Sequence, residues 1–288
     1  MMPKSKQVVI DKSAFDGIRT DALCGFARCH VLLVSDTLLY ECATSDERRK
    51  KGLDRYEKLV RDGAHWCSMS TEYIEWEGKN SRPYPRLLAN AQKTEWIRAQ
   101  TENLDVMLDS QITNKSRDSH WAMPRRMFLE MSRQLHERVC SELPHVASEI
   151  RDLPDCKFAR FQTWLNGIDT YSDIHELALQ WLPSRWIGNT AQFCTSREWM
   201  AWQHLRLSLA VQRDYVYLRQ KGGDPGNRLA EHDDRDVEYV LLLSRADGII
   251  TRDKKLVEPL TRAAFPEKDV FSSLEEVPES YRCDWTNP

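Results

Sequence analysis

The stretch VVIDKSAF at residues 8–15 decides the fold, because it joins a short apolar run to a helical pattern through one acidic residue. The apolar run is typical of a buried strand, and Asp11 ends it. The pattern behind Asp11 is helical and places these apolar residues largely on one side: Ala14, Phe15, Ile18, Leu23 and Phe26. The segment therefore predicts a strand followed by a helix.

The stretch LLVSDTLLYE at residues 32–41 repeats this order. An apolar strand pattern at 31–34 is followed by Ser35 and Asp36, which offer an N-cap for a helix that carries Glu41. Repeated strand-helix units favour a parallel sheet with helices packed against it.

The stretch RDVEYVLLLSRADGIITRDKKL at residues 235–256 returns to the same order near the C-terminus. Asp236 is expected to open a helix over 237–243, and residues 248–251 read as a strand that leads to Asp253. A further helix is expected to stop at Pro266, with a final edge strand at 270–271.

Between these two ends the pattern changes to helices rich in tryptophan. Helical spacing is clearest at 125–143 and 198–218, and shorter patterns occur at 96–108, 158–165 and 174–181. Segments rich in Pro or Gly at 81–86 and 221–227 are interpreted as hinges. We therefore expect an α/β core formed by residues 1–50 and 228–288 and a large all-helical insertion formed by residues 51–227.

Four acidic residues, Asp11, Glu41, Asp236 and Asp253, stand at the edges of these apolar runs. Carboxylates at the ends of parallel strands can meet at one edge of the sheet, and Mg²⁺ and Mn²⁺ prefer oxygen ligands of this kind. The alternative for each residue alone is structural, because Asp11 and Asp236 could cap helices and Glu41 could be a solvated helix residue.

Together the three stretches resemble the motif set of the PIN-domain nucleases. That resemblance implies a PIN-like three-layer α/β/α core with a central, mostly parallel sheet, and it implies that the helical insertion is an addition to the family's pattern. It also implies metal ligation by Asp11, Glu41, Asp236 and Asp253, with Asp234 as the substitute for Asp236. Ser13 and Thr251 would then hydrogen-bond the carboxylates from a second layer.

The function implied by the resemblance is that of a metal-dependent endoribonuclease. Its cofactor would be Mg²⁺ or Mn²⁺, with one or two ions held by four carboxylates activating a water that hydrolyses RNA phosphodiester bonds. RNA is preferred over DNA on family grounds, and the expected substrate is single-stranded RNA. Two alternatives stay open: a non-catalytic PIN-like RNA-binding or scaffold module, and a structure-specific DNA nuclease.

Substrate contacts are expected first at Arg82 and Arg86, on the Pro-stiffened hinge, while the tryptophans of the insertion are expected to pack in its core. The insertion could also recruit a protein partner, and a homodimer is not decided by the sequence.

Composition sets the remaining bounds. The chain has 288 residues, 41% hydrophobic content and a net charge of −3, without an apolar run that suggests a signal peptide or a membrane span. We therefore expect a cytoplasmic protein that does not bind a membrane. The eight cysteines form no CxxC pair, so reduced thiols are expected, and Cys24, Cys29 and His30 lack the second half of a zinc site.

Overall fold

The structure is a computed structural model. It describes residues 5–44, 49–85, 88–100, 153–170, 196–222 and 229–283, with single positions 104, 134, 137, 138 and 175; the side chains of 219–220 and 229–234 are excluded. The predicted helix at 125–143, the greater part of that at 174–181, and Arg86 lie outside these residues, apart from the single positions.

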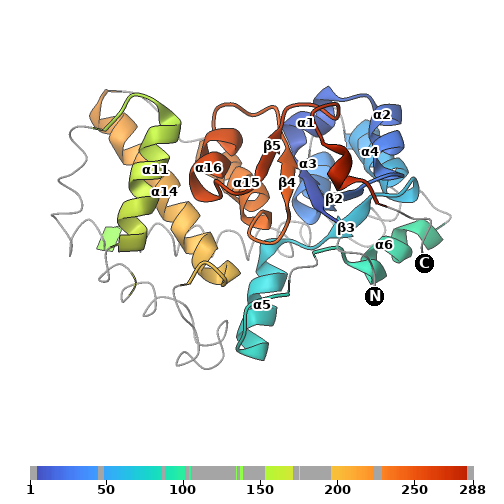
Figure 1. The fold of residues 1–288 in the computed structure, drawn as a ribbon, viewed down its shortest axis with the longest axis horizontal. Coiled ribbons are helices and arrows are strands. Elements are labelled where there is room, and N and C mark those ends of the chain that lie inside the picture. The colour runs from blue at the N-terminus through green and yellow to red at the C-terminus, as the bar shows by residue number, and fades with distance from the viewer. Residues whose placement is uncertain are drawn as a thin grey trace.

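A five-stranded sheet forms the centre of the described structure, with every strand pair parallel (Figure 1). The strands are β1 (Gln7–Ile10), β2 (Val31–Ser35), β3 (His65–Cys67), β4 (Gly248–Ile250) and β5 (Asp269–Phe271). Their order across the sheet is β3-β2-β1-β4-β5. Parallel strands buried on both faces read as continuous apolar runs, and β1 is buried along its whole length. The α/β fold with a parallel sheet is therefore confirmed.

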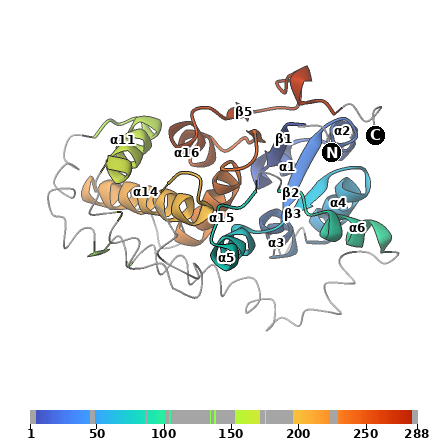
Figure 2. The same ribbon diagram turned by 60° about the horizontal axis from the view of Figure 1, so that its bottom comes forward.

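Helices surround the sheet and continue beyond it (Figure 2). Those of the first hundred residues are α1 (Lys12–Gly17), α2 (Thr20–Ala27), α3 (Asp36–Thr44), α4 (Arg49–Arg61), α5 (Ser70–Asn80) and α6 (Ala91–Ala99). The later ones are α11 (Lys157–Thr170), α14 (Met200–Gln220), α15 (Leu229–Leu242), α16 (Val257–Ala264) and the short 3-10 helix η3 (Glu279–Tyr281).

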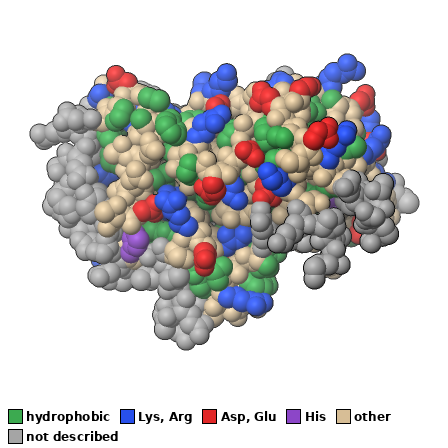
Figure 3. All heavy atoms as spheres, in the orientation of Figure 1, with side chains coloured by type: hydrophobic (Ala, Val, Ile, Leu, Met, Phe, Trp, Pro, Cys, Tyr) green, Lys and Arg blue, Asp and Glu red, His purple; other side chains and the backbone are tan. Residues whose placement is uncertain are grey.

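The helical part and the sheet share one hydrophobic core. In Figure 1, α11 and α14 lie side by side at the end of the molecule away from the sheet, and α11 also contacts α16. Phe161 of α11 and Trp202 of α14 belong to the same buried cluster as Val9 of β1. Trp66, Trp164, Trp199 and Trp202 are buried, as core packing predicts, whereas Trp76 and Trp96 are half-buried. On the face drawn in Figure 3, the described acidic and basic side chains are interspersed.

The all-helical description of residues 51–227 was wrong at one place. Residues 65–67 form β3, which pairs with β2 at Leu33 to His65, Val34 to Trp66 and Ser35 to Cys67. A three-residue strand is too short to show a period of two, so its pattern gives no signal against a helical background. The sheet unit therefore extends past residue 50.

Two helix boundaries also differ from expectation. Asp236 does not open a helix, because α15 begins at Leu229 and places Asp236 in its interior. The single helix expected after β1 is two helices, α1 and α2, since Ile18 is extended (φ −102°, ψ 143°) and ends the first one. The helix stop before Pro266, the strand after Asp247 and the edge position of β5 are as predicted.

Candidate functional site

The strand order creates a topological switch point between β1 and β4. From β1 the chain moves one way to β2 and β3, then returns on the other side of β1 to form β4 and β5. In open parallel sheets, ligands bind outside the carboxyl ends of the strands at such a switch point. Asp11 follows β1 directly, and Thr251 to Asp253 follow β4 directly, so the predicted residues of these two motifs lie at this point.

Asp11 is a buried carboxylate, with 2% of its surface exposed. It is the N-cap of α1, because its Oδ1 accepts the backbone N–H of Ala14 at 2.8 Å. The Ser13 hydroxyl lies 2.9 Å from both carboxylate oxygens, and the Thr251 hydroxyl donates to Oδ2 at 2.6 Å. The capping alternative is thus present in the structure, alongside contacts from β4 that capping does not need.

Thr251 and Ser13 connect Asp11 to the loop after β4. The backbone N–H of Asp253 donates to the Thr251 hydroxyl at 3.0 Å, and that of Arg252 donates to the Ser13 hydroxyl at 2.9 Å. Asp253 in turn accepts the N–H groups of Lys255 (2.6 Å) and Leu256 (3.1 Å) through Oδ1. The hydroxyls of Ser13 and Thr251 therefore hold the loop after β4 against Asp11.

Burial raises the pKa of Asp11 to about 6, and the nearby negative charge of Asp253 adds to the rise. The hydrogen bonds from Thr251, Ala14 and Ser13 act in the opposite direction, because they stabilise the ionised form. The charge of Asp253 is therefore near enough to contribute to the raised pKa of Asp11. A cation placed near both would relieve the cost of their charges.

Glu41 is held by α15. Its Oε2 accepts the hydroxyl of buried Tyr239 at 2.6 Å, and its Oε1 lies 3.8 Å from Nη1 of Arg235. Arg235 also stacks over the Tyr40 ring, 5.2 Å from its centroid. Burial raises the pKa of the Tyr239 hydroxyl, and the negative charges of Glu41 and Asp11 contribute to the rise.

Asp236 lies one turn before Tyr239 on α15 and is half-buried. Residues three apart on a helix share a face, so Asp236 belongs to the side of α15 that meets Glu41. The backbone of Asp234 lies in the same helix, and its side chain lies outside the described residues. The choice between these two acids stays a prediction.

The four predicted acids do not form one closed cluster in the described part of the chain. There, no three His, Cys, Asp or Glu side chains are arranged to hold a metal ion together. Instead, Asp11 and Asp253 are linked through Thr251, and Glu41 is linked to Tyr239. His30, which follows Cys29, stacks on Phe26 with ring centroids 3.9 Å apart.

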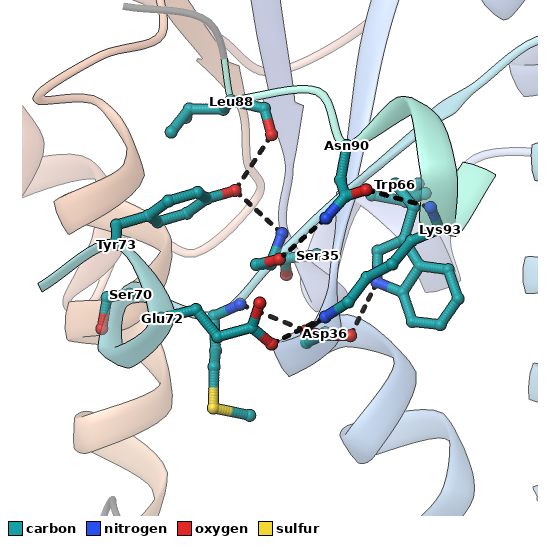
Figure 4. A network of polar contacts seen from close by, with 12 residues as sticks. Ser35, Asp36, Trp66, Ser70, Glu72, Tyr73, Leu88, Asn90 and Lys93 are labelled. Carbon is teal, nitrogen blue, oxygen red and sulfur yellow. Dashed lines mark hydrogen bonds and ion pairs between the residues drawn. The ribbon is translucent and has the colours of Figure 1, made fainter. Parts of the chain in front are cut away.

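A second buried acid lies at the same edge of the sheet, after β2. Asp36 accepts Nε1 of Trp66 at 2.6 Å, the N–H of Met69 at 3.2 Å and Nζ of Lys93 at 3.0 Å, and Lys93 also contacts Glu72 at 2.7 Å (Figure 4). Burial raises the pKa of Asp36, and the Lys93 ammonium opposes that rise. Its contacts fasten α5 and α6 to the ends of β2 and β3.

Arg82 and Arg86, the predicted substrate contacts, are not shown beside the candidate site. The Arg82 guanidinium lies 5.2 Å from the Trp76 ring centroid, beyond the end of α5, and Arg86 is outside the described residues. Arg235 lies beside Glu41, and Lys12, the residue after Asp11, forms an ion pair with Asp16.

No known protein family, characterised protein or solved structure matches this chain. Among the helices described, none is both long enough and apolar enough to cross a membrane.

Sequence reasoning missed Tyr239, Arg235 and the role of Asp36. Tyr239 carried a signal only as an apolar position of a helix, and nothing in its spacing indicates that its hydroxyl reaches Glu41, 198 positions earlier. Asp36 was read as part of an N-cap, whereas the Ser35 hydroxyl makes that cap by accepting the N–H of Leu38 at 3.1 Å.

Proposed function

We propose that the protein is a metal-dependent nuclease that hydrolyses phosphodiester bonds at the switch point between β1 and β4. The observation that carries the proposal is that the Thr251 hydroxyl contacts both the Asp11 carboxylate and the backbone N–H of Asp253, which brings two acidic residues from opposite ends of the chain to one place. A purely structural cap on α1 needs neither Thr251 nor a second acid beside it.

The donor set fits a hard, hydrated divalent cation. It consists of carboxylate oxygens without Cys or His, and Mg²⁺ commonly binds through one or two carboxylates while keeping several waters. Asp11 and Asp253 would hold the ion, with Asp236 and Glu41 reaching it directly or through water. Such an ion lowers the pKa of bound water and neutralises charge on the scissile phosphate.

The chain's own residues supply orientation and charge. Ser13 and Thr251 donate hydrogen bonds to Asp11 and so fix the plane of its carboxylate. Tyr239 holds Glu41 in the same way. Arg235 and Lys12 lie near these acids, and each is in an ion pair, with Glu41 and Asp16 respectively, that a phosphodiester backbone would have to compete with. RNA is preferred over DNA only through the resemblance to PIN-domain nucleases.

A second candidate is a nucleic-acid-binding module without hydrolysis. The contacts of Glu41 with Tyr239 and Arg235 favour this candidate, because they occupy the Glu41 carboxylate. Of the four predicted metal ligands, only Asp11 and Asp253 are then linked to each other through Thr251. A binding module would keep its affinity for RNA when Asp11 is neutralised, whereas a nuclease would lose cleavage.

The experiment incubates the full chain with end-labelled single-stranded and duplex RNA and DNA, in Mn²⁺, Mg²⁺ or EDTA. We expect cleavage of RNA with either metal and none in EDTA. Asp11→Asn and Asp253→Asn should each lower the rate by roughly 100-fold or more, because each removes a charge from the reacting centre. Asp54→Asn, at an exposed position of α4, is the matched control and should cut at the wild-type rate.

RNA that survives intact with both metals, or equal cutting by Asp11→Asn and wild type, would contradict the nuclease proposal. Asp236→Asn and Asp234→Asn, assayed side by side, decide the third acid: the variant with the larger loss identifies it.

A further inference from the structure

The last described residues form a strap across the amino ends of the strands. Tyr281 is 1% exposed, and its hydroxyl contacts Asp269 Oδ2 at 2.7 Å and the Asp247 carbonyl at 3.0 Å. Its ring packs edge-on against Phe271, and Lys6 lies 4.4 Å from its centroid. These contacts fix the chain just before Cys283, at the end of the sheet opposite the candidate site.

Beyond Tyr281 the strap pairs with the start of β2. His30 and Arg282 form an antiparallel bridge, and the Cys283 N–H donates to the Cys29 carbonyl at 2.8 Å. This bond places Cys29 directly opposite Cys283. Directly opposed residues in an antiparallel pair point to the same side, with Cα atoms about 5.5 Å apart when the pair is hydrogen-bonded.

Bridged cysteines have Cα atoms roughly 4.4–6.8 Å apart, so an ideal pair of this kind falls within the range of a disulfide. The Cys29 N–H itself donates to the Phe26 carbonyl at 3.0 Å, in the turn that follows α2. Both cysteines are half-buried thiols, whereas Cys24, Cys42 and Cys67 are fully buried. A small-molecule oxidant can therefore reach this pair more easily than those three.

We propose that Cys29 and Cys283 are a redox-responsive pair that forms an intramolecular disulfide when a low-molecular-weight disulfide such as oxidised glutathione is present. One thiolate attacks the glutathione disulfide and releases one glutathione thiol. The second thiolate then attacks the mixed disulfide and releases the other glutathione thiol. Two cysteine thiols are oxidised by two electrons, and one glutathione disulfide is reduced to two thiols.

The bond would lock the strap onto the junction of α2 and β2 and close a loop that contains most of the chain. A disulfide across so long a loop restricts the unfolded chain strongly, so the oxidised protein should be the more stable form. The strap lies at the opposite end of the strands from Asp11, so the proposal does not depend on the proposed nuclease activity.

The test treats the full-length protein at low concentration with oxidised glutathione, blocks remaining thiols with N-ethylmaleimide and digests with trypsin without reductant. Cleavage after Arg28, Arg48 and Arg282 releases residues 29–48 and 283–288 as separate peptides. We expect these two peptides joined, with fragmentation assigning the bond to Cys29 and not to Cys42. The melting temperature should rise by roughly 5 °C or more on oxidation and return in dithiothreitol.

Cys29→Ser should abolish both the joined peptide and the melting shift, while Cys156→Ser, which changes an exposed cysteine elsewhere, should keep both. Melting of each variant in dithiothreitol verifies that it folds, and the peptide map of the wild type needs no variant at all. Recovery of Cys283 as the maleimide adduct or as a glutathione mixed disulfide would overturn the proposal. So would a Cys283 linkage that persists in Cys29→Ser, or one found only in covalent dimers.

Discussion

At the scale of single residues, Asp11 shows how one side chain can serve both the fold and a site. It begins α1 by accepting the Ala14 N–H, and it joins two strands by accepting the Thr251 hydroxyl. Its burial makes the negative charge expensive, since little water remains to solvate it. The hydrogen bonds offset part of that cost, and a bound cation would offset more.

The pH dependence of stability in EDTA tests this description of Asp11. Its pKa is raised from 3.8 to about 6 in the fold, so the folded chain holds a proton that the unfolded chain has lost between these values. The stability contributed by protonated Asp11 is therefore complete below about pH 4 and is lost as the pH rises through about 6. A shift of this size corresponds to about 3 kcal/mol in the free energy of unfolding.

Asp11→Asn removes that titration while keeping the side chain's shape. In urea unfolding without metal, the stability of wild type relative to Asp11→Asn should fall between pH 4 and pH 7 and stay level above that. Asp54→Asn, at an exposed position, should follow wild type at every pH. If the difference in free energy of unfolding between wild type and Asp11→Asn does not change with pH, burial does not raise the pKa of Asp11.

Sequence patterns identify site residues best where they immediately follow a strand. Asp11, Thr251 and Asp253 are of this kind, because the end of an apolar run fixes their place at the sheet edge. The contact between Tyr239 and Glu41 could not be predicted, since it depends on how α15 and α3 rotate against each other. Packing sets that rotation, and a single helical period does not reveal it.

At the scale of elements, buried Glu77 of α5 joins the sheet unit to the helical part. It accepts the N–H groups of Met200 (2.9 Å) and Ala201 (3.0 Å) at the start of α14, and that of Tyr84 (3.0 Å). The Arg245 guanidinium, which follows α15, lies 3.4 Å from the same carboxylate. The Glu77 carboxylate thus accepts hydrogen bonds from the first N–H groups of α14 and also pairs with the buried Arg245 guanidinium.

Glu77→Ala should lower the free energy of unfolding by about 3 kcal/mol or more, because Arg245 and two helix N–H groups lose their shared partner in a buried place. Glu75→Ala on the same helix is the control, since Glu75 is half exposed and its ion pair with Lys79 is 3.9 Å long. That control should change stability by about 0.5 kcal/mol or less. Urea unfolding at one pH measures both, and equal losses would contradict the assignment of Glu77 as the junction.

Elements with long apolar runs could be predicted from the sequence, and those with short or weak signals could not. The strands at Val8, Leu32 and Ile249 were clear because they are buried on both sides. β3 (His65–Cys67) contains no aliphatic residue, unlike the equally short β4, and the acidic residues before Asp236 were not predicted to be helical. The prediction that Asp236 opens the helix followed from that second error.

At the scale of the whole molecule, the strand order brings residues about 240 positions apart to one place, as the contact between Asp11 and Thr251 shows. The order could be expected only in outline, since the sequence indicates parallel strands but not which ones are neighbours. The central claim is that this place, at the carboxyl ends of β1 and β4, binds a divalent cation through Asp11 and Asp253.

The most direct test is the thermal unfolding of the metal-stripped protein titrated with Mn²⁺, for wild type, Asp11→Asn, Asp253→Asn and Asp54→Asn. A ligand that binds only the folded state stabilises it by about 2.7 kcal/mol at a hundred times its Kd. We expect the melting temperatures of wild type and Asp54→Asn to rise together by roughly 5 °C or more as Mn²⁺ increases. Those of Asp11→Asn and Asp253→Asn should rise far less. An equal rise in all four proteins, or no rise in the wild type, would contradict a cation site at the switch point.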